Sequence, residues 1–226
     1  MESEPFRPDG GTTVEDLIDA LEREADRDRP PAATPEVGVV MGSDSDLDVM
    51  MGTDDDPGAY HALQALGFEE VTDYDDPPGG RSFETYVVSA HRTPDLLYAY
   101  AETAAARGLD VLIAGAGGKS ADLPNMTASI AFPLPTVGVP VQEKSVDSVV
   151  GMPTGAPLVA VDAGKSYNAA LSAAQTLARS DAELRERLHD LHGERRREVA
   201  TVSERLHRLG TPGFRAEREG NEHEDG

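Results

Sequence analysis

Short apolar runs alternate with helical patterns along the middle of the chain. Each run is rich in valine, isoleucine or leucine and is bounded by glycine, proline or polar residues, which is typical of buried strands. Strands are predicted at 37–41, at a run ending in 86–88, and at 111–114, 136–141 and 158–161. Because helical segments separate these runs, the pattern predicts a parallel sheet with helices packed on its faces.

Helical spacing of apolar residues fills the segments between and around these strands. Residues 47–51 and 59–66 are either two helices or one helix with an insertion, since a turn-forming stretch separates them. Residues 142–157 are predicted to be irregular. The other predicted helices are 13–25, 94–107 closed by Gly108, the alanine-rich 168–178, and 181–209. The alanines of 168–178 suit close packing against a sheet or a partner subunit.

Taken together, these elements predict an α/β protein. We expect one doubly wound, three-layer sandwich with a parallel, flavodoxin-like sheet, and helical extensions at both ends. The predicted organisation is an N-terminal extension and linker at 1–35, a catalytic domain at 36–180, and a C-terminal helical extension with an acidic tail at 181–226.

The sequence Tyr-Val-Val-Ser-Ala-His-Arg-Thr-Pro, at 86–94, passes from a strand end to a helix start. His91 and Arg92 therefore lie on a strand-to-helix turn, at the sheet edge where ligands of α/β proteins bind. A titratable imidazole beside a fixed cation suits proton transfer on an anionic substrate. The alternative is an imidazole that only caps the turn.

Two further loops follow strands at the same predicted edge. Gly-Ser-Asp-Ser-Asp at 42–46 offers backbone N–H groups and hydroxyls to a phosphate or ribose, or Ser45 or Asp46 merely caps the next helix. The glycine-rich loop at 115–124 lets a backbone come close to a ligand. Its Gly-Lys-Ser triplet is not a P-loop, because Ile113 stands where that motif requires glycine.

The charge balance narrows the list of partners. With 42 acidic and 20 basic residues the net charge is -22, which disfavours nucleic acid and anionic membranes as partners. Acidic residues recur along the whole chain, which we interpret as adaptation to a very salty cytoplasm; an ordinary acidic protein is the alternative. Cysteine is absent, which excludes disulfides and thiolate chemistry, and no apolar run long enough to span a membrane occurs. We expect a cytoplasmic protein.

Four motifs, in order, closely resemble the PurE family of purine biosynthesis. They are Gly-Ser-Asp-Ser-Asp at 42–46, Ser-Ala-His-Arg-Thr-Pro at 89–94, Ala-Gly-Ala-Gly-Gly at 114–118, and Gly-Lys followed by Asn-Ala-Ala at 164–170. The resemblance covers roughly residues 36–180 and implies a class I-like N5-carboxyaminoimidazole ribonucleotide (N5-CAIR) mutase, an isomerase, from a halophilic archaeon.

The resemblance also implies roles for individual residues. His91 would be the general acid and base, and Arg92 would hold the substrate phosphate. The remaining implied substrate-binding residues are Ser43, Ser45, Asp46, Ser89, Ala90, Gly115, Ala116, Gly117 and Gly118. The implied reaction releases carbon dioxide from the N5 carbamate and captures it at ring carbon C4 to give 4-carboxyaminoimidazole ribonucleotide (CAIR).

An aminoimidazole is electron-rich enough to attack carbon dioxide unaided, so we expect no cofactor and no metal. A proton acceptor and a dry, close-fitting cage suffice. The expected partners are the ribonucleotide and carbon dioxide, a homo-octameric assembly, and a functional link to an ATP-dependent N5-CAIR synthase.

Two alternatives stay open. One is direct carboxylation of aminoimidazole ribonucleotide (AIR), a lyase activity, and the other is a non-enzymatic flavodoxin-like nucleotide-binding module. Arg92 favours the mutase, since the carboxylase class has lysine there. The chain departs from the mutase pattern at Asp122-Leu-Pro-Asn125, where the family has His-Leu-Pro-Gly, and in the shorter stretch at 142–151.

The charge pattern generates the first testable prediction. Repulsion between carboxylates grows as salt is diluted, because the Debye length rises from about 3 Å in 1 M salt to about 10 Å in 0.1 M. We therefore expect assembly and activity to be lost in low salt and retained in molar potassium chloride. A salt titration followed by circular dichroism and activity measures this, and equal stability at both salt levels would refute the adaptation to salt.

Overall fold

The computed structural model describes residues 11–222 in two compact units. The first unit ends at Ser180 and the second begins at Asp181. Six strands form the sheet of the first unit: β1 (Val37–Met41), β2 (Glu69–Glu70), β3 (Ser82–Val87), β4 (Val111–Ala116), β5 (Thr136–Pro140) and β6 (Val159–Ala160).

The strand order is β2-β3-β1-β4-β5-β6, and every pairing is parallel. From β1 the chain moves to the edge strand β2, returns to β3 beside β1, and then pairs β4 with the other side of β1. This reversal confirms the predicted α/β fold with a doubly wound parallel sheet. All five predicted strands are present, and β2 is an additional short edge strand.

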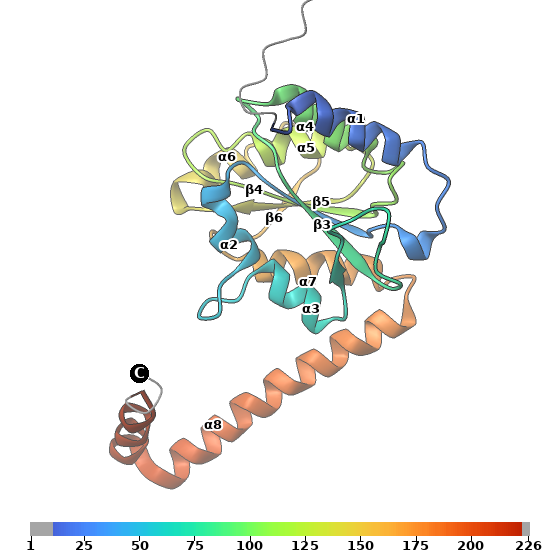
Figure 1. The fold of residues 1–226 in the computed structure, drawn as a ribbon. Helices are drawn as coiled ribbons and strands as arrows, with labels where there is room; N and C mark the ends of the chain where they lie inside the picture. The colour runs from blue at the N-terminus through green and yellow to red at the C-terminus, as the bar shows by residue number, and fades with distance from the viewer. Residues whose placement is uncertain (1–10, 223–226) are drawn as a thin grey trace, which may run out of the picture. The chain divides into compact units, whose positions relative to one another are not determined.

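Helices cover both faces of this sheet (Figure 1). One layer holds α1 (Val14–Ala25), α4 (Pro94–Thr103) and α5 (Leu123–Ile130), and the other holds α2 (Leu47–Met51), α3 (Ala59–Ala65) and α7 (Ser166–Leu177). Every residue of β1 and β4 is buried, as expected for central parallel strands covered on both faces. Since α2 and α3 are separate helices, the segment at 47–66 is two helices and not one.

The N-terminal helix packs against α4 within the first unit. Its first turn is closed by a capping box, in which the Thr13 hydroxyl accepts from the Asp16 N–H and the Asp16 carboxylate accepts from the Thr13 N–H. Leu21 on its inner face is completely buried. The apolar stripe seen in the sequence thus attaches this segment to the sheet's helical layer.

Three local predictions need correction. Residues 142–157 are not wholly irregular, because they contain the 3-10 turn Glu143–Ser145 and the helix α6 (Val146–Val150), whose Val149 is buried. The helix predicted to end at 107 ends at Thr103, and turns lead to Gly108, which has a φ of 97°. Helix α5 was not predicted at all.

The alanines of α7 decide between the two uses that the sequence suggested for this face. Ala169, Ala170, Ala173 and Ala174 are all fully buried within the single chain, because α7 packs on β4, β5 and α3. Of the two predicted uses of this face, packing on the sheet is therefore correct, and the face is not available to a partner subunit.

The second unit consists of α8 (Ala182–Glu222). Its helical geometry breaks at Gly210, which has a φ of 67°, and a second helical segment follows with Pro212 in its first turn. The helix predicted to end at 209 is therefore followed by another, and the Arg205 guanidinium bonds Glu217 across the break at 3.0 Å. Within residues 11–222, no helix is both long and apolar enough to cross a membrane.

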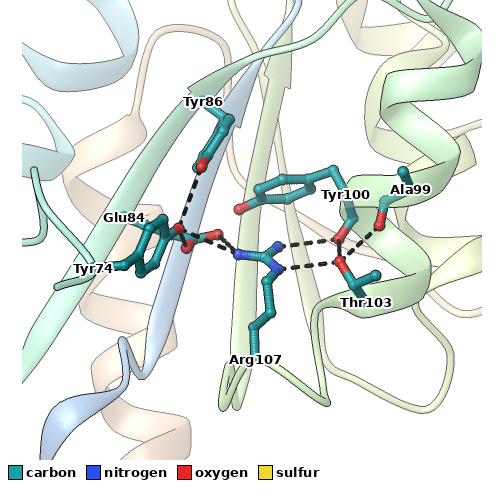
Figure 2. A network of polar contacts seen from close by, with 7 residues as sticks. All are labelled: Tyr74, Glu84, Tyr86, Ala99, Tyr100, Thr103 and Arg107. Atoms are coloured by element: carbon teal, nitrogen blue, oxygen red, sulfur yellow. Dashed lines mark hydrogen bonds and ion pairs between the residues drawn. The ribbon is translucent and has the colours of Figure 1, made fainter. Parts of the chain in front are cut away.

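A buried ion pair joins β3 to the chain that follows α4 (Figure 2). Arg107 donates to Glu84, and both side chains are 1% exposed. Arg107 also donates to the Tyr100 carbonyl at 3.2 Å and the Thr103 hydroxyl at 3.1 Å, and the Tyr74 hydroxyl donates to the second Glu84 oxygen. Although burial disfavours its charge, the Glu84 carboxylate holds the pKa of Arg107 above its ordinary value.

The Tyr100 ring lies under the Arg107 guanidinium, 4.8 Å from ring centroid to Cζ. A Cβ at Gly38 would come within 2.5 Å of the Tyr100 hydroxyl, so only glycine at this place in β1 leaves room for the ring. The network therefore holds β1, β3 and α4 together near the C-terminal end of α4.

This network generates a stability prediction. Glu84→Gln leaves the Arg107 charge buried without its counter-ion, so the free energy of unfolding should fall by about 3–5 kcal/mol. The double variant Glu84→Leu/Arg107→Met should recover most of this loss, because no unpaired charge remains.

Urea unfolding of the three proteins in molar salt measures the effect. Glu204→Gln is the matched control, because Glu204 forms an exposed pair with Arg208 at 3.5 Å, and its loss should cost less than about 1 kcal/mol. A Glu84→Gln variant as stable as this control would contradict the prediction.

Candidate active site

A pocket of about 260 Å³ opens at the carboxyl edge of the sheet. Its lining comes from the loops that follow β1, β3, β4 and β5. It includes the point between β1 and β4 where the strand order reverses, which is where open α/β sheets bind their ligands. The three loops identified in the sequence therefore converge as predicted.

The loop after β1 is held by its own hydroxyls. The Ser43 oxygen accepts from the Ser45 N–H at 3.3 Å and the Ser45 hydroxyl at 3.1 Å, and the Ser43 hydroxyl donates to Asp44 at 3.0 Å. Ser43 rather than Ser45 or Asp46 is thus the capping residue of this turn. Both serines line the pocket, and each hydroxyl can form further hydrogen bonds there.

Asp46 is the buried charged residue of the pocket, at 7% exposure. Burial raises the pKa of its carboxyl, while hydrogen bonds from the N–H groups of Gly117 and Ser43 and the Arg92 charge oppose this increase. The carboxylate therefore bridges the loops after β1 and β4. A Cβ at Gly117 would lie 3.0 Å from the Asp46 Oδ1, so glycine is what lets the two approach.

The loop after β3 is a tight turn between Ser89 and Thr93. The Ser89 N–H donates to the Thr93 hydroxyl at 2.9 Å, and the Thr93 N–H donates to the Ser89 carbonyl at 3.0 Å. Arg92 folds back over this turn, and its Nη2 donates to the Gly42 carbonyl at 3.2 Å. Arg92 is not among the residues lining the pocket, whereas Ser89, Ala90 and His91 are.

His91 lies at the rim, with 63% of its side chain exposed. Its Nε2 is 3.1 Å from the Oδ2 of Asp122, the residue immediately before α5. The imidazole therefore does not cap its own turn, which Ser89 and Thr93 close without it. It instead spans from the β3 loop to the β4 loop at the mouth of the pocket.

The glycine-rich segment divides between packing and lining. Gly115 lies within β4, where a Cβ would be 2.0 Å from the Met50 sulfur, so its role is to admit the Met50 side chain. Ala116, Gly117 and Gly118 line the pocket, and Gly118 has a φ of 86° that favours glycine.

The pocket thus gathers nine of the eleven predicted site residues, all except Arg92 and Gly115. Those nine are Ser43, Ser45, Asp46, Ser89, Ala90, His91, Ala116, Gly117 and Gly118. It also contains residues that were not predicted, namely Gly42, Ser120, Asp122, Leu123, Gln142 and Lys144. Gln142 and Lys144 directly follow β5, so the rule that identified the other loops could have found them.

The polar lining suits a small, hydrophilic, anionic ligand, with hydroxyls and backbone N–H groups for hydrogen bonds and Lys144 as a cation. Among residues 11–222, no three histidine, aspartate or glutamate side chains are grouped so as to hold a metal ion.

Comparisons with known proteins place this geometry among relatives. A family model described as AIR carboxylase matches residues 36–198. An N5-carboxyaminoimidazole ribonucleotide mutase of Thermotoga maritima is 37% identical over 182 residues, covering 78% of this chain and 94% of that protein. A protein of the same name from Bacillus subtilis is 40% identical over 180 residues, covering 76% and 98%.

The crystal structure of Treponema denticola PurE has the same fold. It superposes with a TM-score of 0.58 at 20% identity, covering 76% of this chain and 98% of that chain. The shared architecture extends over nearly the whole of that protein.

Asp46 generates a pH prediction. Because burial raises its pKa, the folded state binds the Asp46 proton more tightly than the unfolded state does, and this contribution to stability is lost as pH rises above about 4. An asparagine side chain cannot ionise, so Asp46→Asn should gain stability relative to wild type between acidic and neutral pH, by about 1.4 kcal/mol per unit of the increase in pKa.

Urea unfolding in molar salt across this pH range gives the difference directly. Asp48→Asn, an exposed aspartate in the neighbouring helix α2, controls for the loss of a charge. An Asp46→Asn advantage that stays constant or shrinks with rising pH would contradict the burial argument.

Proposed function

Because the chain belongs to the AIR carboxylase family, we propose that it is a mutase that converts N5-CAIR to CAIR in purine biosynthesis. Its curated relatives in Thermotoga maritima and Bacillus subtilis carry this activity in their names. The observation that carries the proposal is the position of His91 at the mouth of a polar pocket lined by the loops that follow β1, β3, β4 and β5.

The reaction can be followed atom by atom. The carbamate C–N bond breaks to release carbon dioxide, and the exocyclic nitrogen takes up a proton from the protonated His91 imidazole, which becomes neutral. Ring carbon C4 then attacks the carbon dioxide to form the new C–C bond, and the C4 proton leaves to His91. Protons and electron pairs balance over the two steps, so an imidazole that donates and accepts one proton is sufficient.

The other pocket residues would bind the ribonucleotide. The Ser43 and Ser45 hydroxyls and the Asp46 carboxylate face the pocket as hydrogen-bonding groups for a ribose or phosphate, and the Gly117–Gly118 backbone would enclose the carbon dioxide. The Arg92 guanidinium donates to the Gly42 carbonyl beside the first loop, and it would bind the substrate phosphate there.

Direct carboxylation of AIR is the second candidate, and the description of the family favours it. Arg92 favours the mutase, since the resemblance associates lysine at this position with the carboxylase class. A purified-protein assay that compares N5-CAIR with AIR plus bicarbonate decides between them. Turnover of neither compound, with binding retained, would indicate a nucleotide-binding module without catalytic activity.

The cellular setting completes the proposal. The protein would act in the cytoplasm of a halophilic archaeon as a homo-octamer, supplied with N5-CAIR by an ATP-dependent synthase. The recurrent acidic residues support the halophilic setting. Since the alanine face of α7 is buried within the chain, an octamer would have to use other surfaces.

The proposed role of His91 generates the next prediction. His91→Asn should lower kcat by about two to four orders of magnitude, because asparagine cannot transfer a proton, while substrate affinity changes little. His192→Asn, at an exposed histidine of α8, is the matched control and should retain wild-type kinetics. Steady-state kinetics in molar salt measures both, and a His91→Asn enzyme with most of its activity would eliminate His91 as the proton carrier.

A further inference from the structure

Asp122 is the residue that contacts the imidazole of His91. We propose that Asp122 is a positioning residue that orients His91 and fixes its tautomer for proton transfer. The inference rests on the proposed function, and it adds a residue for which neither the motifs nor the resemblance provides a role.

The contact with the Asp122 carboxylate favours one neutral tautomer of the His91 imidazole. The His91 Nε2 lies 3.1 Å from the Asp122 Oδ2 as a charge contact. Because a carboxylate oxygen only accepts hydrogen bonds, we expect the contact to favour the neutral imidazole that carries its hydrogen on Nε2. The lone pair then lies on Nδ1, which has no hydrogen-bond partner within residues 11–222. Nδ1 is therefore the atom that accepts the substrate proton, and the imidazolium formed is stabilised by the adjacent carboxylate.

Asp122 is itself well supported. It immediately precedes α5, whose first turn is held by the Asn125 side-chain amide donating to the Ser148 carbonyl of α6 at 2.7 Å. The Thr127 hydroxyl donates to the Leu123 carbonyl at 2.8 Å in the same turn. A carboxylate placed by a fixed helix start can hold an exposed imidazole that its own loop leaves free to rotate.

The two residues involved are those that depart from the His-Leu-Pro-Gly pattern. Asp122 replaces the histidine and lies 3.1 Å from the His91 Nε2, and Asn125 replaces the glycine and donates a hydrogen bond to α6. Histidine and glycine could not make these contacts in the same way. A neutral histidine carries no negative charge and has a donor as well as an acceptor, and glycine has no side chain.

The first test reads the tautomer without turnover. Nitrogen-15 NMR of the full-length protein in alkaline buffer, where imidazoles are neutral, should show His91 as the Nε2–H form in wild type. The signal is assigned by its loss in His91→Asn. Asp122→Ala should shift His91 toward a mixture of both tautomers, whereas Asp147→Asn, an exposed aspartate in α6, should leave it unchanged.

The second test measures kinetics in molar salt. Asp122→Asn can turn its amide to donate to Nε2 and so favour the wrong tautomer, and kcat should fall at least about tenfold with KM within about twofold of wild type. Asp122→Glu should restore part of kcat, and Asp147→Asn should match wild type. Thermal unfolding of each variant shows that the fold is retained; Asp122→Asn serves if Asp122→Ala does not fold.

The outcomes are distinguishable. A wild-type His91 in the Nδ1–H form, an Nε2–H form that persists without Asp122, or an Asp122→Asn enzyme with full kcat would each overturn the role of Asp122. A folded wild-type protein that does not convert N5-CAIR would instead overturn the proposed function, and the tautomer alone would then decide whether Asp122 positions His91.

Discussion

The pocket depends on one buried carboxylate. Asp46 accepts hydrogen bonds from the N–H groups of Ser43 and Gly117, and so joins the loops after β1 and β4 where the strand order reverses. Its desolvation is costly, and the two backbone donors offset part of that cost. A Cβ at position 117 would lie 3.0 Å from the Asp46 Oδ1, so a larger residue in the second loop would have to displace this side chain of the first. A ligand-binding edge is thus built before any ligand is present.

The turn that carries His91 depends on a second, more distant constraint. His91 lies between β3 and α4, and the Glu84–Arg107 ion pair fixes β3 to the chain beyond the far end of α4. Because β3 and α4 are both held, the backbone of the turn between them has little conformational freedom. The Ser89–Thr93 hydrogen bonds restrict it further. The side chain of His91 remains exposed and rotatable, which is why a contact from outside the turn matters for it.

Local sequence patterns identified what local physics determines. The apolar runs located β1, β4 and β5, and the helical spacing of apolar residues located α1, because burial patterns repeat over a few neighbouring residues. The rule that α/β proteins bind ligands at the carboxyl edge of the sheet predicted nine of the residues that line the pocket. The contact of His91 with Asp122 could not be predicted, because it joins two loops whose separation is set by the sheet. The same holds for the burial of Asp46, and for the alanine face of α7, where composition alone did not distinguish a sheet from a subunit.

The three lysines of this very acidic chain lie at one edge of the sheet. All three lysines lie in loops after strands of the sheet, Lys119 after β4, Lys144 after β5 and Lys165 after β6, at the edge that holds the pocket. In molar salt the Debye length is about 3 Å, so neither these lysines nor the acidic surface acts far into the solvent. The surface cannot then repel an anionic substrate, and the edge cannot attract it from a distance. In such salt a ligand would have to be bound by groups in direct contact with it, such as the serine hydroxyls that the loops after β1, β3 and β4 bring to the pocket.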